Sequence, residues 1–382
     1  MSRSSEAAAR TFHRTATHYR HTKTLAREYY TSPGILAEEQ ERLFATQWNC
    51  VGRVSRLAEP GAYFLCSVAG ESLIVLRDRQ GELRALFNVC RHRGTRLCTE
   101  AEGHFSGTIQ CPYHAWTYGT DGRLIGAPHM QDVEGFAKED FPLHAAALAE
   151  WEGFIFVNLA ADPVPFAQAW APMLGRLARY AMAGLWVGHR VSYDVAANWK
   201  LVFENYSECL HCPMIHPELS VVLPYQSGAN DLIEGPFLGG YMEITEPNES
   251  ATLSGRACGR LVNPELPAED RHRAFYYSLK PNMLLSIHPD YVNYYLVTPV
   301  TPDRTTVESE WLFHPGNQDD PAFHPEDAIG FWDVTNRQDW AIVARSQLGI
   351  GSRKYQPGVY SARESIPAAW DRAYLKLMGR EA

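Results

Sequence analysis

The chain has 382 residues, 45% hydrophobic and 21% charged, a composition typical of a globular protein rather than a disordered or fibrous one. Lys and Arg number 35 and Asp and Glu 44, and the resulting net charge of −9 disfavours binding to a nucleic-acid backbone. No run of about 18 apolar residues predicts a membrane-spanning helix, and eight Cys are too few for a disulfide scaffold.

Basic charge is concentrated at the N-terminus. Residues 1–27 contain five Arg and one Lys against the single acid Glu6, a net of +5, which leaves −14 for the remaining chain. Such a start can signal organelle targeting, but no apolar stretch followed by small residues marks a secretion signal. We expect a partly helical tail that packs on the body of a cytoplasmic protein. In that reducing compartment, unpaired cysteines usually bind metals or take part in catalysis.

In chain order, the first predicted element is an amphipathic helix over residues 36–48, where apolar side chains recur three and four positions apart. From about residue 51 to 160, short β-branched and aromatic runs alternate with turn dipeptides such as Pro60-Gly61, which predicts a small all-β domain. We therefore divide the chain into an N-terminal helical segment, a β domain and a C-terminal domain on which the helical segment packs: residues 1–46, 47–160 and 161–382.

The third segment mixes both kinds of secondary structure. The pattern predicts a strand near residues 189–196, a long helix from about Trp199 and four strands between residues 273 and 314. A final helix pair is predicted to start near Pro325 and end before Gly349. Helices that flank an antiparallel sheet give an α+β fold class for the whole chain, with the all-β domain first.

Two mixed Cys–His pairs form the first candidate metal site. Cys90 and His92 are separated by one residue, and Cys111 and His114 by two. A structural zinc site normally pairs like with like, as C-x₂₋₄-C and H-x₃₋₅-H. Here each pair offers one thiolate and one imidazole, so each loop can supply one ligand to each iron of a Rieske [2Fe–2S] cluster. The two cysteines would bind one iron and the two histidines the other.

The residues around these pairs carry a family resemblance. Gly94 permits a tight turn and Pro112 shapes the second loop. The motif C-x-H-R-G…C-P-Y-H-A-W resembles the Rieske domain of the Rieske-type non-haem iron oxygenases, the ring-hydroxylating and demethylating family, over about residues 47–160. Four other cysteines are expected to be small packing residues: Cys50, Cys66, Cys98 and Cys258.

The second candidate metal site lies in the sequence ENYSECLHCPMIHP. Glu204, Glu208 and His211 are spaced at i, i+4 and i+7, which predicts one face of a helix. His216 would lie about 140° away from His211 on an ideal helix, but Pro213 breaks the ladder and can bring the two imidazoles together. Two imidazoles, one carboxylate and open positions are the facial triad of non-haem Fe(II) oxygenases.

The motif E-N-x-x-E-x-x-H-x-x-x-x-H resembles the catalytic-domain motif of the same family. The resemblance implies that His211 and His216 are iron ligands. It also implies a third, carboxylate ligand in a Gln–Asp context followed by an apolar helical turn, for which we choose Asp339. The other acid of this segment, Asp333, is expected to be an exposed helix residue.

Glu208 occupies the position of the family's bridging acid. The resemblance implies that this carboxylate links the Rieske histidine of one subunit to an iron-ligating histidine of its neighbour in a head-to-tail ring of three. Glu rather than Asp at this position resembles the choline, betaine and carnitine oxygenase branch, whereas Leu210 departs from the Tyr often found there. The alternative is a charge on the helix face three residues from His211.

Three further residues lie among these ligands. Asn205 is a candidate for orienting water or a ligand near the iron, with a surface or capping residue as the alternative. Cys209 and Cys212 form a C-x-x-C that invites a redox interpretation, but we expect them to be packing thiols.

The resemblance implies a terminal oxygenase that takes NAD(P)H-derived electrons from a separate reductase, since no G-x-G-x-x-G follows a strand. The Rieske cluster would pass electrons to Fe(II), which activates O₂ to hydroxylate or N-demethylate a small quaternary ammonium or N-methyl compound. Two alternatives stay open: an aromatic ring-hydroxylating dioxygenase, and a Rieske electron-transfer or sensor protein without oxygenase activity. We expect a homotrimer, or a multiple of three, with no nucleic-acid or membrane partner.

Aromatic side chains of the catalytic half can form a cation–π cage for a trimethylammonium group, although most are expected to pack in the sheet. A cage with an acid suits a cation, whereas an Arg or an apolar slot suits an arene. The candidates are Tyr276, Tyr277, Tyr291, Tyr294, Tyr295, Trp311 and Phe313.

Overall fold

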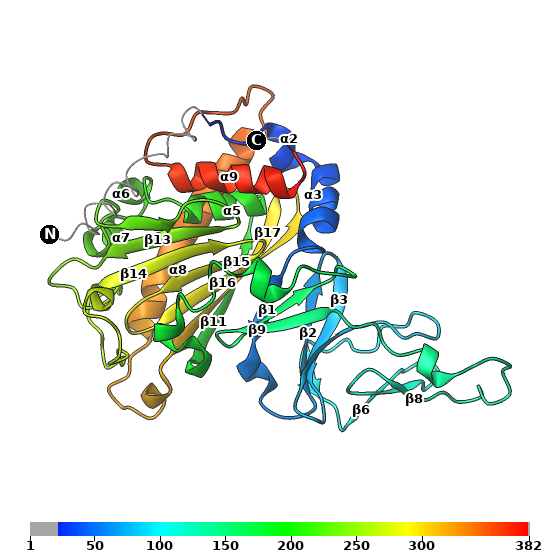
Figure 1. Ribbon diagram of the computed structural model, residues 1–382. Coiled ribbons are helices and arrows are strands. Elements are labelled where there is room, and N and C mark those ends of the chain that lie inside the picture. The colour runs from blue at the N-terminus through cyan, green and yellow to red at the C-terminus, as the bar shows by residue number, and fades with distance from the viewer. Residues whose placement is uncertain (1–21, 381–382) are drawn as a thin grey trace. The chain divides into compact units, whose positions relative to one another are not determined.

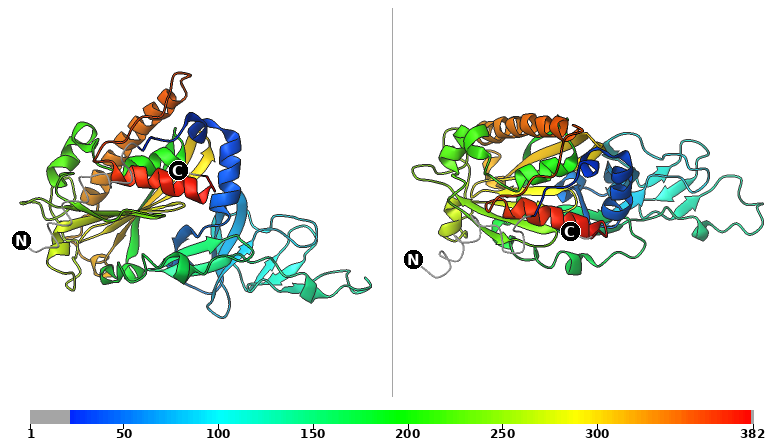
Figure 2. Two further views of the ribbon diagram at one scale, coloured as in Figure 1. Left: turned by 45° about the horizontal axis from the view of Figure 1, so that its top comes forward. Right: turned by 90° about the horizontal axis from the view of Figure 1, so that it is seen from above.

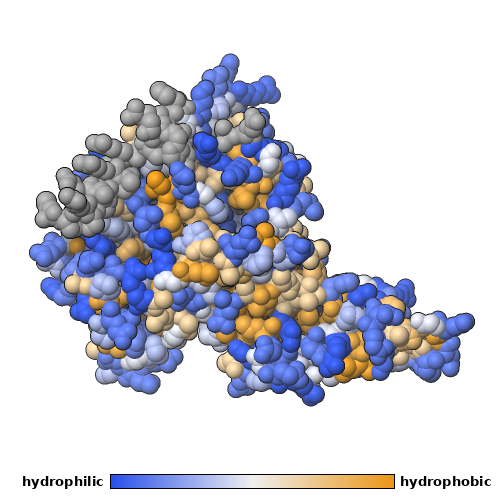
Figure 3. All heavy atoms as spheres, viewed as in Figure 1, coloured by the Kyte–Doolittle hydropathy of each residue, from blue (hydrophilic) through white to orange (hydrophobic). Residues whose placement is uncertain are grey.

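The computed structural model describes residues 22–380 and contains two compact units, each of which has its own core (Figure 1). Residues 40–171 form one unit, and the described residues 22–39 and 172–380 form the other. Most of the basic N-terminal segment, for which a partly helical tail is predicted, lies outside the described residues. No helix among the described residues has the length and apolarity needed to cross a bilayer. On the face drawn in Figure 3, hydrophobic residues gather in patches between hydrophilic ones.

The unit of residues 40–171 is built from three antiparallel sheets, ordered β1-β10-β9, β4-β3-β2-β5 and β6-β7-β8. The strands are β1 (Asn49–Arg53), β2 (Ala62–Val68), β3 (Glu71–Arg77), β4 (Leu83–Phe87), β5 (Glu102–His104), β6 (Thr108–Gln110), β7 (Thr117–Gly119), β8 (Leu124–Gly126), β9 (Ala147–Trp151) and β10 (Phe154–Asn158). Ala69 and Gly70 join β2 to β3 with φ of 51° and 78°, as a two-residue type I′ hairpin requires.

The other unit, which we call the catalytic unit for the site described below, is centred on a seven-stranded antiparallel sheet of order β11-β17-β16-β15-β14-β13-β12. Its strands are β11 (Trp186–Val195), β12 (Ala229–Leu232), β13 (Phe237–Glu243), β14 (Arg273–Leu279), β15 (Met283–Ile287), β16 (Val292–Thr301) and β17 (Arg304–Phe313). All residues of β15 are buried, and its apolar run MLLSI fits a central strand covered on both faces. With an all-β unit and this sheet flanked by helices, the predicted α+β class is confirmed.

The main helices of this unit are α2 (Arg27–Thr31), α3 (Pro33–Glu39), α5 (Trp199–Tyr206), α6 (Cys212–Ile215), α7 (Pro217–Val222), α8 (Glu326–Ile350) and α9 (Ser365–Leu377). Helices α5, α8 and α9 lie on one face of the sheet (Figure 2). Shorter helical segments are α4 (Phe166–Ala169) in the β unit and the 3₁₀ turns at Ala178–Tyr180 and Met182–Gly184.

Three helix predictions need correction. The helix expected over residues 36–48 ends as an α-helix at Glu39 and continues as a π-helix over Gln40–Phe44. The expected pair between residues 325 and 349 is one continuous 25-residue helix, α8, because nothing in this stretch breaks the hydrogen-bond ladder. The last helix of the chain, α9, lies after this span and was not predicted.

Candidate metal centres

Helix α5 begins at an Asn198 cap, whose side chain accepts a hydrogen bond from the Lys200 amide at 3.1 Å, and it ends at Tyr206. The prediction that Glu208 and His211 continue a helix face is therefore wrong. Glu208 instead turns its carboxylate back onto the backbone amides of Leu210 and His211, and this side-chain bonding competes with the helical ladder. The ligand residues thus lie on a short connection after the helix.

His211 is held by the same carboxylate. Its Nδ1 lies 2.6 Å from Glu208 Oε1, so Nδ1–H donates to the carboxylate and the lone pair of Nε2 faces away from it. The Asn205 amide nitrogen lies 3.4 Å from that Nε2 and can reach a ligand bound there. Glu208 therefore fixes the orientation of His211, in the manner of the outer carboxylates that support metal-binding imidazoles.

His216, at the end of α6, brings its imidazole close to that of His211. Pro213 lies in the first turn of α6 and starts this new short helix rather than breaking a longer one, and His216 directly follows α6. The His211 and His216 rings come within 5.2 Å between centroids. His216 Nδ1 donates to Gln338 Oε1 at 2.7 Å, which leaves its Nε2 directed at Asp339. The predicted meeting of the two imidazoles thus occurs, through a different backbone path.

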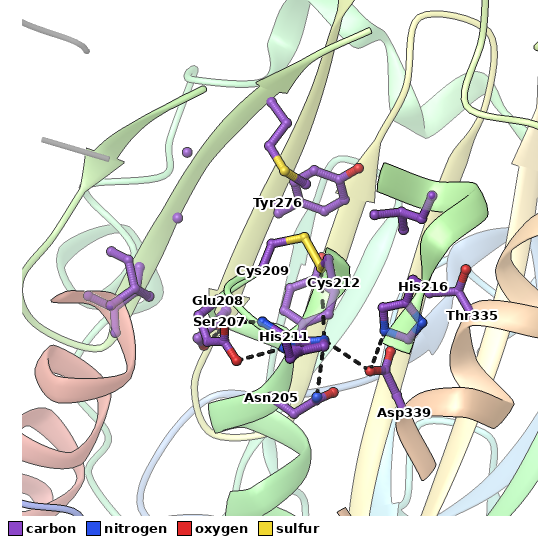
Figure 4. Close-up of a pocket in the computed structure, with 18 of the residues that line it drawn as sticks. Asn205, Ser207, Glu208, Cys209, His211, Cys212, His216, Tyr276, Thr335 and Asp339 are labelled. Atoms are coloured by element: carbon purple, nitrogen blue, oxygen red, sulfur yellow. Dashed lines mark hydrogen bonds and ion pairs between the residues drawn. A yellow bond between two sulfur atoms is a disulfide. The ribbon is translucent and has the colours of Figure 1, made fainter. Parts of the chain in front are cut away.

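Asp339 on α8 completes the group (Figure 4). Its Oδ1 lies 2.9 Å from His216 Nε2 and 3.3 Å from His211 Nε2, so one carboxylate oxygen faces both imidazoles. Burial alone lowers the pKa of His211, but hydrogen bonds to Asp339 and Glu208 outweigh it and raise this pKa to about 10. Burial likewise raises the pKa of Asp339, yet the two imidazoles bring it below its usual value.

These donors fit a divalent metal. Two Nε2 lone pairs and a carboxylate converge, and the negative field that raises the His211 pKa also attracts a cation in place of the proton. Asp333, the acid we did not choose, points elsewhere and accepts hydrogen bonds from Tyr193 and Arg337 at 2.8 and 2.9 Å. The geometry therefore supports Asp339 over Asp333 as the metal-facing carboxylate.

A cavity of about 100 Å³ opens beside this group. Of the seven aromatic candidates, only Tyr276 is among its lining residues; the other six are buried in the core. Sequence reasoning missed three aromatic residues that line it: Tyr206, Tyr241 and Trp332. Trp332 precedes Asp339 by seven residues, two helical turns, a spacing that could have identified it. Gln338 was also missed as a partner of His216.

The C-x-x-C that brackets His211 differs from our expectation. Cys209 and Cys212 form a disulfide with Cα atoms 5.0 Å apart, so they are not packing thiols. The turn before α6 brings the two Cα atoms into the range that a disulfide needs. The other six cysteines are free; Cys50, Cys90 and Cys111 are buried, and Cys66, Cys98 and Cys258 are half-buried.

The first Cys–His loop follows β4 and the second follows β6, and the two have the same backbone pattern. The amide of Cys90 donates to Thr95 and that of Gly94 to Cys90, while the amides of Cys111 and Ala115 repeat these bonds one loop later. Gly94 has φ of 71°, which confirms the tight turn predicted there. Ala115 adopts φ of 55°, uncommon for a residue with a side chain, so the second loop imposes the same turn.

The four predicted cluster ligands come together at these turns. The thiols of Cys90 and Cys111 are buried and within hydrogen-bonding reach of each other, and the His92 and His114 rings are 4.7 Å apart. Trp116 stacks on His92 at 4.8 Å and holds its plane. Burial, followed by His114, lowers the pKa of His92, whose buried Nδ1 has no hydrogen-bond partner. Two buried thiols and two imidazoles fit a Rieske cluster.

Comparisons with known proteins identify the family. A model described as the ring hydroxylating alpha subunit (catalytic domain) matches residues 182–379, more than half of the chain, and one described as the Rieske [2Fe-2S] domain matches residues 47–137. The chain belongs to the Rieske ring-hydroxylating oxygenase alpha-subunit family. The predicted family and class of enzyme are confirmed: this is the oxygenase component of a Rieske non-haem iron oxygenase.

Individual relatives of this Rieske oxygenase are named for quaternary ammonium substrates. The glycine betaine monooxygenase oxygenase subunit of Chromohalobacter salexigens is 32% identical over 378 residues, 88% of this chain and 82% of that protein. The carnitine monooxygenase oxygenase subunit of Acinetobacter baumannii is 36% identical over 201 residues, 51% of this chain and 53% of that protein. The quaternary ammonium Rieske monooxygenase CntA, solved with L-carnitine, has a TM-score of 0.76 at 25% identity, with 93% and 96% of the two chains covered.

Proposed function

We propose that this oxygenase component hydroxylates or N-demethylates a small quaternary ammonium or N-methyl compound. The observation that carries the proposal is the lining of the cavity beside the metal-facing residues. Four aromatic side chains and two acids line it, and none of its described lining residues is Lys or Arg: the six are Tyr206, Tyr241, Tyr276, Trp332, Glu208 and Asp339. Aromatic faces attract a cation, and the described lining offers no Lys or Arg to pair with the carboxylate of a carboxylated arene.

The cavity has about 100 Å³ and is open rather than enclosed, so a compact head group can lie beside the candidate iron ligands while the rest of the substrate extends outward. An aromatic ring-hydroxylating dioxygenase remains the alternative that a product analysis would expose.

We propose His211, His216 and Asp339 as the ligands of the mononuclear iron, with Glu208 and Gln338 holding the Nδ1–H groups of the two imidazoles. Bound iron would activate O₂ for insertion into a C–H bond, and the Rieske cluster would supply electrons singly. Because both Nδ1 protons are held by acceptors, both Nε2 atoms stay available as ligands. Asn205 would orient a ligand beside His211.

The Rieske cluster would be held by two cysteines and two histidines: Cys90, Cys111, His92 and His114. The two thiols are buried and the two histidines are half-buried, so electrons would leave the cluster through a histidine imidazole. We propose Rieske and catalytic domains over residues 47–160 and 161–382, with residues 1–46 packing on the latter. The Tyr30 hydroxyl donates to Glu204 at 2.8 Å, which supports this packing.

We propose that Glu208 also carries electron transfer between subunits of a head-to-tail homotrimer served by a separate NAD(P)H reductase. Glu208 is bound to His211 yet partly exposed, with 16% of its side-chain surface accessible, so a neighbouring subunit can reach it. Glu208→Gln should leave both metal sites filled and slow single-turnover oxidation of the Rieske centre. Normal oxidation would contradict the role, and sedimentation analysis checks the trimer.

We place the enzyme in the cytoplasm; its six free cysteines suit a reducing compartment, whereas the Cys209–Cys212 disulfide has to form against that tendency. Cell fractionation with an antibody against the chain tests this placement.

The substrate class is tested with NADH, a generic reductase and matched substrate pairs. Each trimethylammonium compound is compared with its neutral tert-butyl analogue, which has the same shape without the charge. We expect O₂ uptake and an oxidised product only with the cation. Hydroxylation of an N-methyl group would release formaldehyde, and hydroxylation of the neighbouring carbon would release the free amine and an aldehyde of the remaining chain. A diol formed from an arene, or equal turnover of the neutral analogue, would overturn the proposal.

A matched pair of variants locates the cation. Tyr276→Leu removes an aromatic face from the cavity, whereas Tyr276→Phe keeps the face and removes only the hydroxyl, which is buried without a hydrogen-bond partner. A cation–π contact of about 0.5–2 kcal/mol corresponds to a rise in KM of about 2- to 30-fold. We expect that rise in Tyr276→Leu and not in Tyr276→Phe.

A further inference from the structure

The disulfide between Cys209 and Cys212 brackets His211, one of the proposed iron ligands. Both cysteines line the cavity, and the sulfur–sulfur bond lies beside the His211 ring (Figure 4). Cys209 is half-buried and Cys212 is 4% exposed. A disulfide on the cavity wall can be reached by small reductants and oxidants that enter from solvent.

The Cys212 sulfur lies close to the metal-facing nitrogens. Its Sγ is 3.9 Å from His211 Nε2, and ligand atoms of His211, Cys212 and His216 all lie within 4.8 Å of one another. Metal–nitrogen bonds of about 2.0–2.1 Å and metal–sulfur bonds of about 2.3 Å place tetrahedral ligands about 3.3–3.6 Å apart. The distance from the Cys212 sulfur to His211 Nε2 therefore exceeds ligand spacing by about 0.3 Å.

The chemical state of that sulfur decides whether it can bind. Metals bind thiolates, and in the disulfide the Cys212 sulfur is bonded to Cys209 and carries no negative charge. A thiolate is a soft ligand that shifts the preference of a site from iron with open positions toward closed tetrahedral zinc. Freed from Cys209, Cys212 would join His211, His216 and Asp339 as a fourth ligand.

We propose that Cys209 and Cys212 form a redox switch on the mononuclear metal site. The oxidised pair withholds sulfur and keeps positions open for O₂ and substrate; the reduced pair offers Cys212 as a competing ligand and closes the site. The inference rests on the proposed role of His211, His216 and Asp339 as metal ligands, and its test is separate from turnover.

The two redox steps balance with simple partners. A dithiol reductant attacks the disulfide, so Cys209 and Cys212 each gain one hydrogen while the reductant becomes a disulfide. In the reverse step, hydrogen peroxide takes two electrons and two protons from the thiols, which re-form the disulfide with release of two waters.

The first experiment measures the state of the pair in the folded enzyme. Separate aliquots of native protein are alkylated without treatment, after dithiothreitol, and after dithiothreitol is removed and peroxide added, and the labelled cysteines are mapped by peptide mass spectrometry. We expect Cys209 and Cys212 to be unlabelled, then labelled, then unlabelled again. A pair that stays labelled after peroxide, or unlabelled after dithiothreitol without denaturant, would overturn the switch.

The second experiment asks whether sulfur reaches the metal. The mononuclear site is emptied with a chelator and loaded with Zn²⁺, and zinc K-edge X-ray absorption, which does not detect the cluster iron, measures the ligand shell. Reduced wild type should gain one sulfur neighbour at about 2.3 Å, and oxidised wild type should have none. Cys209→Ser should show this sulfur without reductant, because Cys212 is already free, whereas Cys212→Ser should never show it.

A zinc–sulfur distance that persists in Cys212→Ser, or is absent from reduced wild type that binds zinc through nitrogen and oxygen alone, would overturn the proposal while leaving the metal site intact. Failure of oxidised wild type to bind zinc at all would instead refute the proposed metal site, and the switch with it.

Discussion

Replacement of Glu39 by Gln is expected to be one of the most destabilising single changes outside the metal centres. Glu39 ends α3 and lies fully buried against α5. Its Oε1 lies 2.5 Å from Lys200 Nζ and accepts the Tyr374 hydroxyl of α9 at 2.5 Å, and its Oε2 accepts the Trp199 indole at 2.8 Å. One carboxylate thus joins three helices of the catalytic unit.

The cost follows from the burial of both charges. Glu39 and Lys200 each have 0% side-chain exposure, and burial lowers the pKa of Lys200 although Glu39 opposes this effect. Removing one charge of a buried pair leaves the other without compensation and costs about 3–5 kcal/mol. The neighbouring Glu38 is the matched control, because its pair with Arg380 has 28% and 29% of the side chains exposed and contributes about 0–1 kcal/mol.

Thermal unfolding followed by near-ultraviolet circular dichroism of the tryptophans measures both variants. A loss of 1 kcal/mol lowers the Tm of a unit of this size by about 2–4 °C. Glu39→Gln should therefore melt about 6–20 °C below wild type, and Glu38→Gln at most about 4 °C below it. Adding Lys200→Met to Glu39→Gln should recover much of the loss, because an apolar side chain replaces the stranded charge. Equal Tm values for Glu39→Gln and Glu38→Gln, or no recovery, would refute the reasoning.

Three further outcomes are expected. Gln338→Leu removes the acceptor for His216 Nδ1 and should weaken metal binding about 10- to 100-fold. A chelator competition measures this affinity, and an unchanged value would contradict the orienting role of Gln338. Asp339→Ala should lower iron from about three to about two atoms per chain while the Rieske EPR signal persists, and full iron content would refute the ligand. Burial lowers the pKa of Lys280 to about 7, so between that pH and about 10 the unfolded chain binds more protons there than the folded one. Unfolding free energy should therefore rise by up to about 1.4 kcal/mol per pH unit. Denaturant titrations at pH 8 and 9 should show this rise in the unfolding free energy of wild type. At both pH values Asp371, with its pKa of about 7, is mostly ionised in the folded and the unfolded chain. In Lys280→Met, the share of the rise that comes from Lys280 should be absent.

The sequence could predict the metal-facing residues because their types and spacings are chemically restrictive. A thiol and an imidazole in each of two loops are compatible with few kinds of metal site. The choice of His216 and Asp339 rests in the same way on the two imidazoles and one carboxylate that a non-haem iron site needs. The backbone that carries them was harder to predict. Whether α5 continues to His211 depends on whether the Glu208 carboxylate bonds to backbone amides, a local competition that periodicity does not reveal.

The cavity wall was the least predictable part. Tyr241 on β13 and Trp332 on α8 meet across the fold, and only the sheet order and the placement of α8 bring them together. Aromatic residues on β15 and β16 have the same composition but face the core. The Cys209–Cys212 bond likewise depends on where α5 stops. Long-range packing decides each of these points.

The repeated turns of the two Cys–His loops bear on how a substitution there would act. Each loop closes on its own amide–carbonyl bonds, and those of Cys90 and Cys111 are equivalent. The two loops are therefore the same backbone unit used twice, with Gly94 and Ala115 at the matching left-handed positions. A change that opens either turn should displace the thiol and the imidazole of that loop together, rather than one side chain alone.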